Sequence, residues 1–283
     1  MRSALGALAL LLTSTLAAGD QPSPIAPRDI RSFRPSANGF AFVNHFTGTP
    51  LPGGLAALTE GLGKRLGAPS TFGLCGGMSF AAADLFLAGR TPPAQTTQPT
   101  RAEPLLEYIQ TRQIDSVGPG MSLAGTFGRW MSLPDNGAPG TRALSIAEID
   151  ALDASLDAGA PAVIGLVFTR HPGNNDSTAR AGSSWENHQV LAYAATRNAS
   201  AGTIEFRIYD PNYPKDDAAV IRCRAVQTGT MLVAPWGGWS VPVMGYTSER
   251  RVTGSRPGHV YITPVRGVIA MPYAPSVPPD GLN

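Results

Sequence analysis

The segment Phe72-Gly73-Leu74-Cys75-Gly76-Gly77-Met78-Ser79-Phe80 places a cysteine between glycines, and an apolar run over 81–86 follows it. This pattern predicts a buried helix that begins near Cys75 and ends at about Gly89, since glycine favours helix ends. Glycine also lets other backbone approach closely. Free N–H groups and the dipole at a helix N-terminus favour thiolate over thiol. The segment therefore predicts either a nucleophilic cysteine or a small buried packing residue.

The predicted secondary structure of the rest of the chain changes from helices to strands near residue 160. Before that point the patterns predict helices at 55–66 and 103–114, and another that opens on the capping box Ser145-Ile146-Ala147-Glu148, whereas the Gly-rich stretch 116–142 is expected to be irregular. After it they predict strands, at 161–169, 189–196, 203–209, 218–226, 231–234, 241–246 and 258–263. Helices followed by strands indicate an α+β fold, in which an N-terminal helical lobe packs on a C-terminal antiparallel sheet.

The ends of the chain are expected to lie outside this fold. Residues 1–19 have the form of a signal peptide, with Arg2, an apolar run over 4–12 and small residues to Gly19. Residues 20–37 are interpreted as an extended leader, 38–265 as one domain and 266–283 as a Pro-rich tail. We therefore expect a secreted or periplasmic protein without a membrane span.

Composition argues against several classes of function. The formal net charge of +2 gives no basis for nucleic acid or an anionic membrane as a partner. His45, His171 and His259 have no metal-ligand spacing, so neither a metal nor another cofactor is expected. The sequence gives no indication of the oligomeric state.

A base for Cys75 is found in the predicted sheet. His188 lies in Asn187-His188-Gln189-Val190, at the start of a predicted strand, and the next strand ends in Tyr209-Asp210-Pro211-Asn212. If residues 189–209 form a hairpin with its turn near 199 or 200, antiparallel pairing brings His188 opposite residue 210 or 211. Asp210 can then orient the imidazole, with Asn212 in reserve. The alternative is that His188 is a polar residue at the entrance of a strand and that Asp210 and Pro211 open a turn.

The order Cys75, His188, Asp210 resembles that of the papain-like cysteine peptidase superfamily, and in particular the branch in which an Asp followed by Pro is the third catalytic member. The motifs Gly-Leu-Cys-Gly-Gly-Met and Asn-His-Gln-Val are also similar to those of a group of uncharacterised secreted bacterial proteins. The resemblance spans roughly residues 40–215, although few residues carry it. It implies a papain-like cleft between a helical lobe and a sheet, a peptide or amide substrate, Cys75 as nucleophile, His188 as base and then acid, and Asp210 as the orienting group.

One part of that pattern is missing. Papain-like enzymes usually place a Gln shortly before the Cys to help hold the oxyanion, and residues 69–74 contain no amide side chain. The backbone N–H of Cys75 can supply one donor. Asn44 is the tentative second donor, against the alternative of a structural Asn in a turn.

Other functions remain compatible with the same residues. In an oxidising compartment Cys75 and Cys223 could form a disulfide, which would leave a non-catalytic binding or structural protein on a papain-like scaffold. Trp236 and Trp239 would then be available to a partner. An acyltransferase would use the same triad as a hydrolase.

Overall fold

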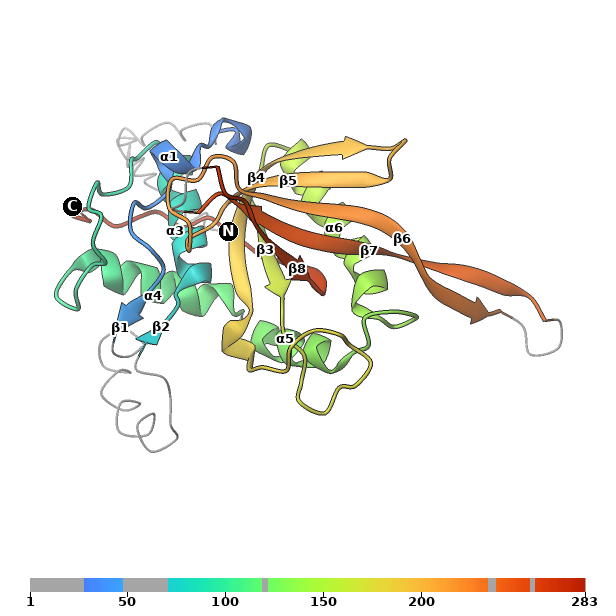
Figure 1. Ribbon diagram of the computed structural model, residues 1–283. Helices are drawn as coiled ribbons and strands as arrows, with labels where there is room; N and C mark the ends of the chain where they lie inside the picture. Colours follow the sequence, from blue (N-terminus) through green and yellow to red (C-terminus); the bar gives the residue numbers. More distant parts are fainter. Residues whose placement is uncertain (1–27, 48–70, 119–121, 234–237, 255–257, 283) are drawn as a thin grey trace, which may run out of the picture.

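A computed structural model describes residues 28–47, 71–118, 122–233, 238–254 and 258–282. In these ranges the chain forms helices packed on a seven-stranded sheet of order β8-β7-β6-β5-β4-β3-β9 (Figure 1). Neighbouring strands are antiparallel throughout this sheet. The predicted α+β class is confirmed. The predicted helix at 55–66 and the predicted signal peptide lie outside the described residues.

The helices are short or of medium length. They are α1 (Pro35–Asn38), α3 (Cys75–Leu87), α4 (Pro104–Ser116), α5 (Ser122–Ser132) and α6 (Thr141–Asp157), with 3-10 turns η1 (Ile30–Ser32) and η3 (Ser184–Glu186). The large sheet contains β3 (Ala162–Val167), β4 (His188–Asn198), β5 (Thr203–Tyr209), β6 (Val220–Leu232), β7 (Ser240–Val252), β8 (Tyr261–Val265) and β9 (Gly267–Met271). A separate pair is formed by β1 (Phe46–Thr47) and β2 (Thr71–Phe72). No helix in the described ranges is long and apolar enough to cross a membrane.

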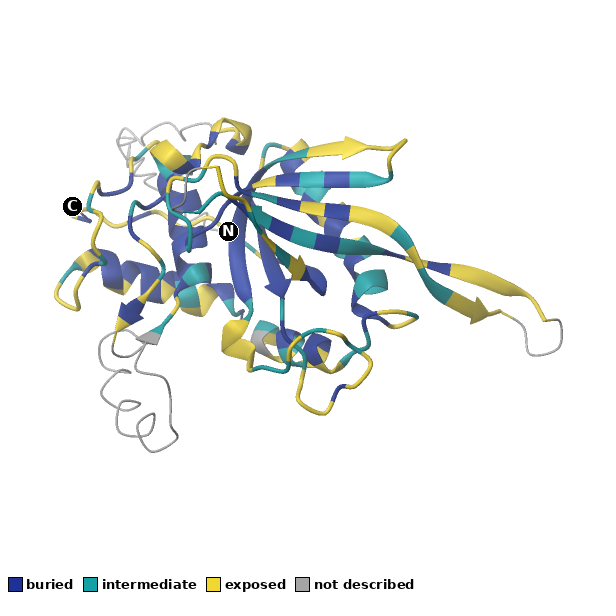
Figure 2. Ribbon diagram, viewed as in Figure 1, coloured by how far each residue is buried: buried dark blue, intermediate teal, exposed yellow. Residues whose placement is uncertain are grey.

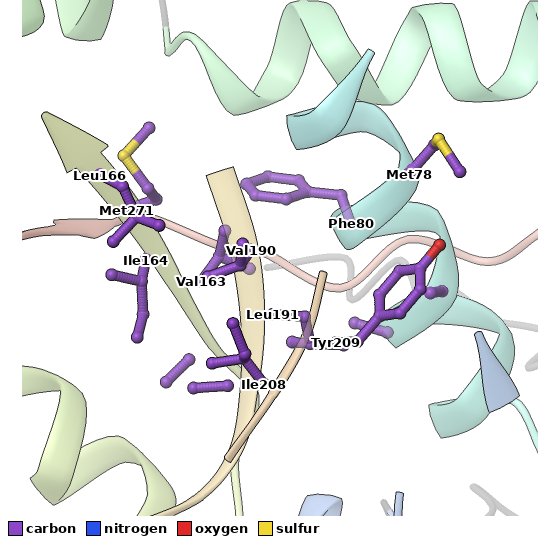
Figure 3. Packing of buried hydrophobic residues seen from close by; sticks show 14 of the residues in the cluster. Met78, Phe80, Val163, Ile164, Leu166, Val190, Leu191, Ile208, Tyr209 and Met271 are labelled. Carbon is purple, nitrogen blue, oxygen red and sulfur yellow. The ribbon is translucent and has the colours of Figure 1, made fainter. Parts of the chain in front are cut away.

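The core lies where α3 and α6 meet the middle of the sheet. Helix α3 packs against β4 and β3, and α6 packs against β9, β3 and β7. Phe80 of α3 points toward Val190 of β4, while Ile164 and Met271 extend the same cluster over β3 and β9 (Figure 3). Every residue of β3 is buried, as expected for a strand with cover on both faces. The packing of α3 on β4 brings the two predicted site segments together.

Helix α6 begins earlier than the capping box predicts. It begins at Thr141, with Gly140 as its N-cap and no side-chain cap. Ser145 Oγ instead accepts a bond from Val268 N at 3.0 Å, and Glu148 Oε2 accepts one from Ala270 N at 2.9 Å. Capping residues bond whichever backbone N–H groups lack partners, and here the unpaired edge of β9 supplies them.

The predicted irregular stretch 116–142 contains helix α5. Phe127, Trp130 and Met131 are all buried, and their i, i+3, i+4 spacing puts them on one helical face. Gly125 and Gly128 favoured a loop in the sequence pattern. In the structure both lie in the helix, and a Cβ on either would meet no atom within 4 Å, so packing does not require glycine at these positions. Tertiary burial of one apolar face has outweighed the low helix propensity of the glycines.

Part of the predicted extended leader is a packed segment. Ile30 and Phe33 are fully buried, and the Phe33 ring lies 5.4 Å from Phe86 of α3 and 6.1 Å from Tyr209 of β5, measured between centroids. Asp29 caps the turn η1 by accepting from Arg31 N. The prediction of a leader was wrong over 28–37 because two apolar side chains outweigh the local Pro and Ser content.

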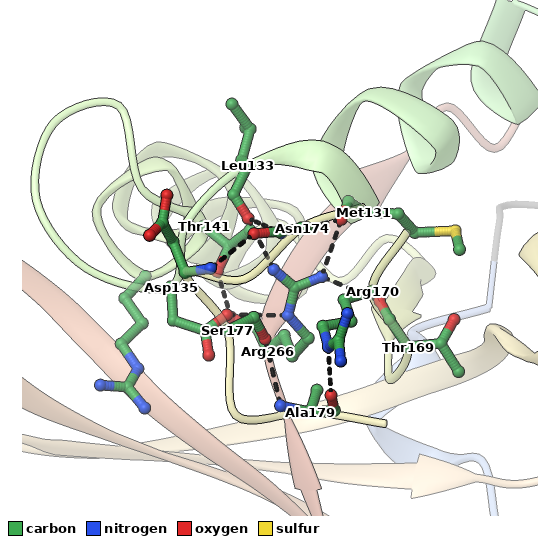
Figure 4. A network of polar contacts seen from close by, with 12 residues as sticks. Met131, Leu133, Asp135, Thr141, Thr169, Arg170, Asn174, Ser177, Ala179 and Arg266 are labelled. Carbon is green, nitrogen blue, oxygen red and sulfur yellow. Dashed lines mark hydrogen bonds and ion pairs between the residues drawn. The ribbon is translucent and has the colours of Figure 1, made fainter. Parts of the chain in front are cut away.

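The predicted tail begins with an edge strand and a buried arginine. Residues 267–271 form β9 against β3. The guanidinium of Arg266 forms an ion pair with Asp135 at 2.7 Å and donates to the carbonyls of Leu133 and Thr169 at 2.7 and 2.8 Å (Figure 4). Residue 266 therefore joins the end of β3 to the segment between α5 and α6, and the prediction of a tail from this residue was wrong.

The last residues are held against the helices by a buried carboxylate. Asp84 of α3 accepts from the hydroxyl groups of Tyr273 at 2.6 Å and Tyr108 at 2.8 Å, and from Ser276 N at 2.9 Å. Arg112 of α4 forms an ion pair with it at 2.7 Å. Burial nevertheless raises the pKa of Asp84 above its usual value. These contacts fix α3, α4 and the C-terminal segment relative to each other.

Strands β6 and β7 extend beyond the rest of the sheet as a two-stranded arm (Figures 1 and 2). The segments 218–226 and 231–234 were predicted as separate strands, but one strand with an irregularity between Gln227 and Gly229 spans most of both. The arm exposes apolar side chains near its end: Met231, Leu232, Val233, Trp239 and Val241. Trp239 is 75% exposed, and Trp236 lies outside the described residues.

Candidate active site

Cys75 is the first residue of α3, as the glycine-flanked segment predicts. The backbone leading into the helix is fixed by two side-chain amides. Asn44 Oδ1 accepts from Leu74 N at 2.5 Å, and Gln113 Oε1 of α4 accepts from Gly77 N at 2.8 Å. Cys75 as a whole residue is half-buried. A helix start held on both sides gives the sulfur a defined position.

The glycines after Cys75 are required by close packing of α3 on α4 and β4. A Cβ on Gly77 would lie 2.1 Å from the carbonyl oxygen of Ile109. A Cβ on Gly76 would lie 2.1 Å from Ser116 Oγ and 2.6 Å from Gln189 Oε1. Neither glycine has a positive φ, so they provide space and not an unusual backbone conformation.

His188 is the first residue of β4 and is 5% exposed. It pairs with Leu166 across the β3–β4 ladder. The preceding residue anchors the loop that leads into the strand, because Asn187 Oδ1 accepts from Phe168 N at 2.9 Å. The histidine is thus held at the first position of β4, the strand on which α3 packs (Figure 1).

Asp210 directly follows β5 and is fully buried. Its Oδ1 lies 2.8 Å from His188 Nε2. Bonding at Nε2 leaves the Nδ1 side of the ring for the Cys75 thiol, which lies close enough that the charge of each group shifts the pKa of the other. The structure therefore brings the three predicted residues Cys75, His188 and Asp210 into one contiguous cluster.

The strand register differs from the one predicted for the hairpin. The turn is centred about one residue later than expected, since Asn198 pairs with Thr203, and the irregularity between Ala192 and Ala194 reverses part of that shift, so that Leu191 faces Tyr209. Continuing that register puts Asp210 nearest to residue 190 and not directly opposite His188. The side chains meet diagonally across the strands, within the reach that diagonal neighbours allow.

The charged forms of Cys75 and His188 stabilise each other, and each group shifts the pKa of the other. Burial alone would raise the pKa of the Cys75 thiol, but the charge and hydrogen bond of His188, together with the backbone N–H groups of Gln189 and Gly76, hold it below its usual value. Burial alone would lower the pKa of His188, but the Asp210 carboxylate and the Cys75 thiolate raise it to about 9. A thiolate–imidazolium pair is the state these environments favour.

Asp210 has more partners than the sequence predicts. Burial favours its neutral form, yet His188, Arg250 and the N–H of Asn212 keep the pKa of Asp210 below its usual value. Arg250 Nη1 lies 3.2 Å from Oδ2, and Asn212 N donates to Oδ1 at 2.9 Å. Asn212, the reserve candidate, therefore reaches Asp210 through its backbone, and its side chain accepts from Asn44 Nδ2 at 2.9 Å.

Asn44 lies beside the site but its described hydrogen bonds are structural. Its Oδ1 bonds Leu74 N, its Nδ2 bonds the Asn212 side chain, and its backbone N bonds the carbonyl of Pro211. These bonds connect the backbone before Cys75 to the residues after Asp210. The role of oxyanion donor stays a prediction for Asn44.

The two cysteines do not form a disulfide. Both are free, and Cys223 is buried on β6, where Ser248 Oγ donates to its sulfur at 3.3 Å. Burial raises the pKa of Cys223 to about 12, with the Ser248 bond acting weakly in the opposite direction. The disulfide expected in the non-catalytic alternative is therefore absent from the structure, and the two thiols differ sharply in environment.

Sequence reasoning missed Arg250 and two glutamines at the site. Arg250 stands at an inward position of β7, between buried Ser248 and Val252, and an arginine in the buried register of a strand is the signal that could have found it. Gln189 is 4% exposed and its Oε1 has no hydrogen-bond partner among the described residues. Gln113 gave no recognisable signal, because the bond it makes depends on how α4 packs against α3.

Comparisons with protein-family models, with curated proteins and with solved structures found no match.

Proposed function

We propose that this chain is a cysteine hydrolase that cleaves an amide or peptide bond with a papain-like arrangement of Cys75, His188 and Asp210. The single observation that carries the proposal is that the Cys75 thiol, the His188 ring and the Asp210 carboxylate lie in one cluster: His188 Nε2 is 2.8 Å from Asp210 Oδ1, and Cys75 and His188 are close enough for the charge of each to shift the pKa of the other. A nucleophile, a base within reach and a third group that orients the base are the parts that nucleophilic catalysis needs.

The first half of the proposed reaction forms a thioester. The Cys75 thiolate attacks the substrate carbonyl carbon, and the backbone N–H of Cys75 at the start of α3 is the proposed donor to the developing oxyanion. The C–N bond then breaks, and the His188 imidazolium gives its proton to the leaving amine. A pKa of about 9 keeps His188 protonated at neutral pH until that step.

The second half restores the enzyme. Neutral His188 takes a proton from water, the hydroxide attacks the thioester, and the acid product leaves as the thiolate and imidazolium form again. Asp210 keeps Nε2 hydrogen-bonded throughout, so that Nδ1 stays directed at the sulfur and the attacking water. The signal-like residues 1–19 support a secreted or periplasmic location as part of the same proposal.

Labelling by a peptidyl epoxide probe, read by intact mass, tests the proposal with a matched pair of cysteine variants. The wild-type chain and C223A should be labelled at Cys75, whereas C75A should not be labelled. Cys223 is the appropriate control because burial keeps its thiol protonated. Circular dichroism of each variant checks that the fold is retained.

The labelling result distinguishes a catalytic Cys75 from an unreactive one. Labelling of C75A equal to that of the wild type, or an unlabelled wild-type chain against a varied peptidyl panel, would contradict the proposal. Release of amine from a fluorogenic amide library, with no transfer product when amines are added, is the expected outcome for a hydrolase.

A further inference from the structure

Arg250 occupies an unusual place for a charged side chain. Its side chain is 11% exposed, and its guanidinium carbon lies over the rings of Phe168 and Tyr213, 5.3 Å from each centroid. Nη1 forms an ion pair with Asp210 Oδ2 at 3.2 Å, and Nη2 is 3.5 Å from Thr263 Oγ1. A buried guanidinium needs a compensating charge, and Asp210 is the carboxylate it contacts.

We propose that Arg250 is a positioning residue of this site, whose charge offsets that of Asp210 so that His188 faces a fixed hydrogen-bond acceptor with little net charge behind it. The role of Arg250 in catalysis rests on the proposed function. It adds a fourth residue, from β7, to a site otherwise built from α3, β4 and the end of β5.

The reason lies in what an uncompensated carboxylate does to a neighbouring imidazole. A buried Asp in contact with a histidine stabilises the imidazolium strongly, because the interior screens charge weakly. An imidazolium that is too stable is a poor proton donor to a leaving amine. With Arg250 on Oδ2, the carboxylate still orients the ring through Oδ1, but part of its field is cancelled.

The charged and titratable groups around His188 come from several elements. Cys75 approaches from α3, Asp210 from the end of β5, and Arg250 from β7 behind the carboxylate. Thr263 of β8 and the rings of Phe168 and Tyr213 are neutral contacts of the guanidinium. Removing the positive charge of Arg250 should therefore raise the pKa of His188, and removing the negative charge of Asp210 should lower it.

The test is the titration of the His188 ring, followed by carbon-13 NMR at Cε1 in the full chain carrying C75S, which removes the thiolate from the measurement. His188 is assigned from the signal lost in H188N. R250Q should raise the pKa of His188 by about one unit and D210N should lower it by at least as much. The double variant should lie between the two single variants.

Arg251 provides the matched control. It is the next residue on β7, carries the same charge, and pairs with Glu249 at 3.7 Å and not with Asp210. R251Q should leave the His188 titration unchanged. R250K should also leave it close to that of the parent chain, whereas a purely packing role predicts that R250K and R250Q behave alike. If R250Q does not fold, R250M removes the charge and keeps an apolar stem against the two rings.

A His188 pKa that is unchanged or lowered in R250Q and R250M would overturn the inference. This outcome is separate from failure of the proposed function. The function fails if Cys75 in the wild-type chain reacts as an ordinary thiol, whatever the His188 titration shows, since that titration is measured without substrate and without the thiolate.

Discussion

The three side chains of the site are restrained to different degrees. Asp210 is held at both oxygens, by His188 and Asn212 N on Oδ1 and by Arg250 on Oδ2. His188 is restrained through Nε2 and through the start of β4, whereas Cys75 is partly exposed at a helix terminus. The restraint therefore decreases from the orienting group to the nucleophile, which is the group that must reach substrate.

A pH dependence follows from the raised pKa of His188. The imidazolium has to protonate the leaving amine, so formation of the thioester should decline as pH rises through about 9, where His188 loses its proton. Single-turnover release of amine, measured from pH 7 to 10.5 in the wild-type chain, checks this. A rate of amine release that has not declined by pH 10 would show that His188 is not the proton donor.

The sequence allowed Cys75, His188 and Asp210 to be predicted because each has a local signal. Cys75 is flanked by glycines before an apolar run, His188 begins a strand, and Asp210 follows the partner strand. Gln113 had no such signal, and Arg250 had only that of an arginine in the buried register of a strand, since the roles of both depend on contacts with segments distant in sequence, at Gly77 and Asp210.

At the scale of elements, the site depends on how closely α3 approaches α4. Gly77 is a point of close approach, because a Cβ built there would lie 2.1 Å from the carbonyl oxygen of Ile109. The bond from Gly77 N to Gln113 Oε1 crosses the same interface. The helix start that positions the thiol is therefore a product of helix–helix packing as well as of local sequence.

Substitution of two helical glycines tests this interpretation. G77A should lower the free energy of unfolding by about 2 kcal/mol or more, because backbone atoms of α4 must move away from the new methyl group. G128A, in α5, should raise it by up to about 1 kcal/mol, since open space surrounds that position. Urea unfolding of both variants gives the comparison.

Equal effects of the two substitutions would contradict the close-packing argument. Both glycines are in helices without positive φ, so a difference between them reports the space around each Cα.

Element boundaries were less predictable than element types. Helix α5 was missed because its glycines outweighed three apolar residues in the sequence pattern, and α6 was started late because Ser145 and Glu148 have the form of a cap. In the structure both residues bond the edge strand β9. That strand comes more than a hundred residues later, so no local pattern could have shown the pairing.

At the scale of the whole molecule, segments from both ends of the chain close over the core. Ile30 and Phe33 pack on α3 and the sheet from the N-terminal side, and Tyr273 bonds Asp84 from the C-terminal side. The α+β class could be predicted from the order of helices and strands, but these closing segments could not. Their Pro-rich composition indicated extended chain, and their burial depends on surfaces formed by distant residues.

The proposed catalytic site also depends on the whole molecule, because Cys75 and Asp210 are brought together only by the packing of α3 on the sheet. The rate of Cys75 alkylation by iodoacetamide, followed against pH by peptide mapping, tests it most directly. The wild-type chain should reach half its maximal rate well below the ordinary thiol pKa of about 8.5, and H188N should move that midpoint upward by at least about one unit. A midpoint at or above 8.5 that H188N leaves unchanged would contradict an activated thiolate at Cys75.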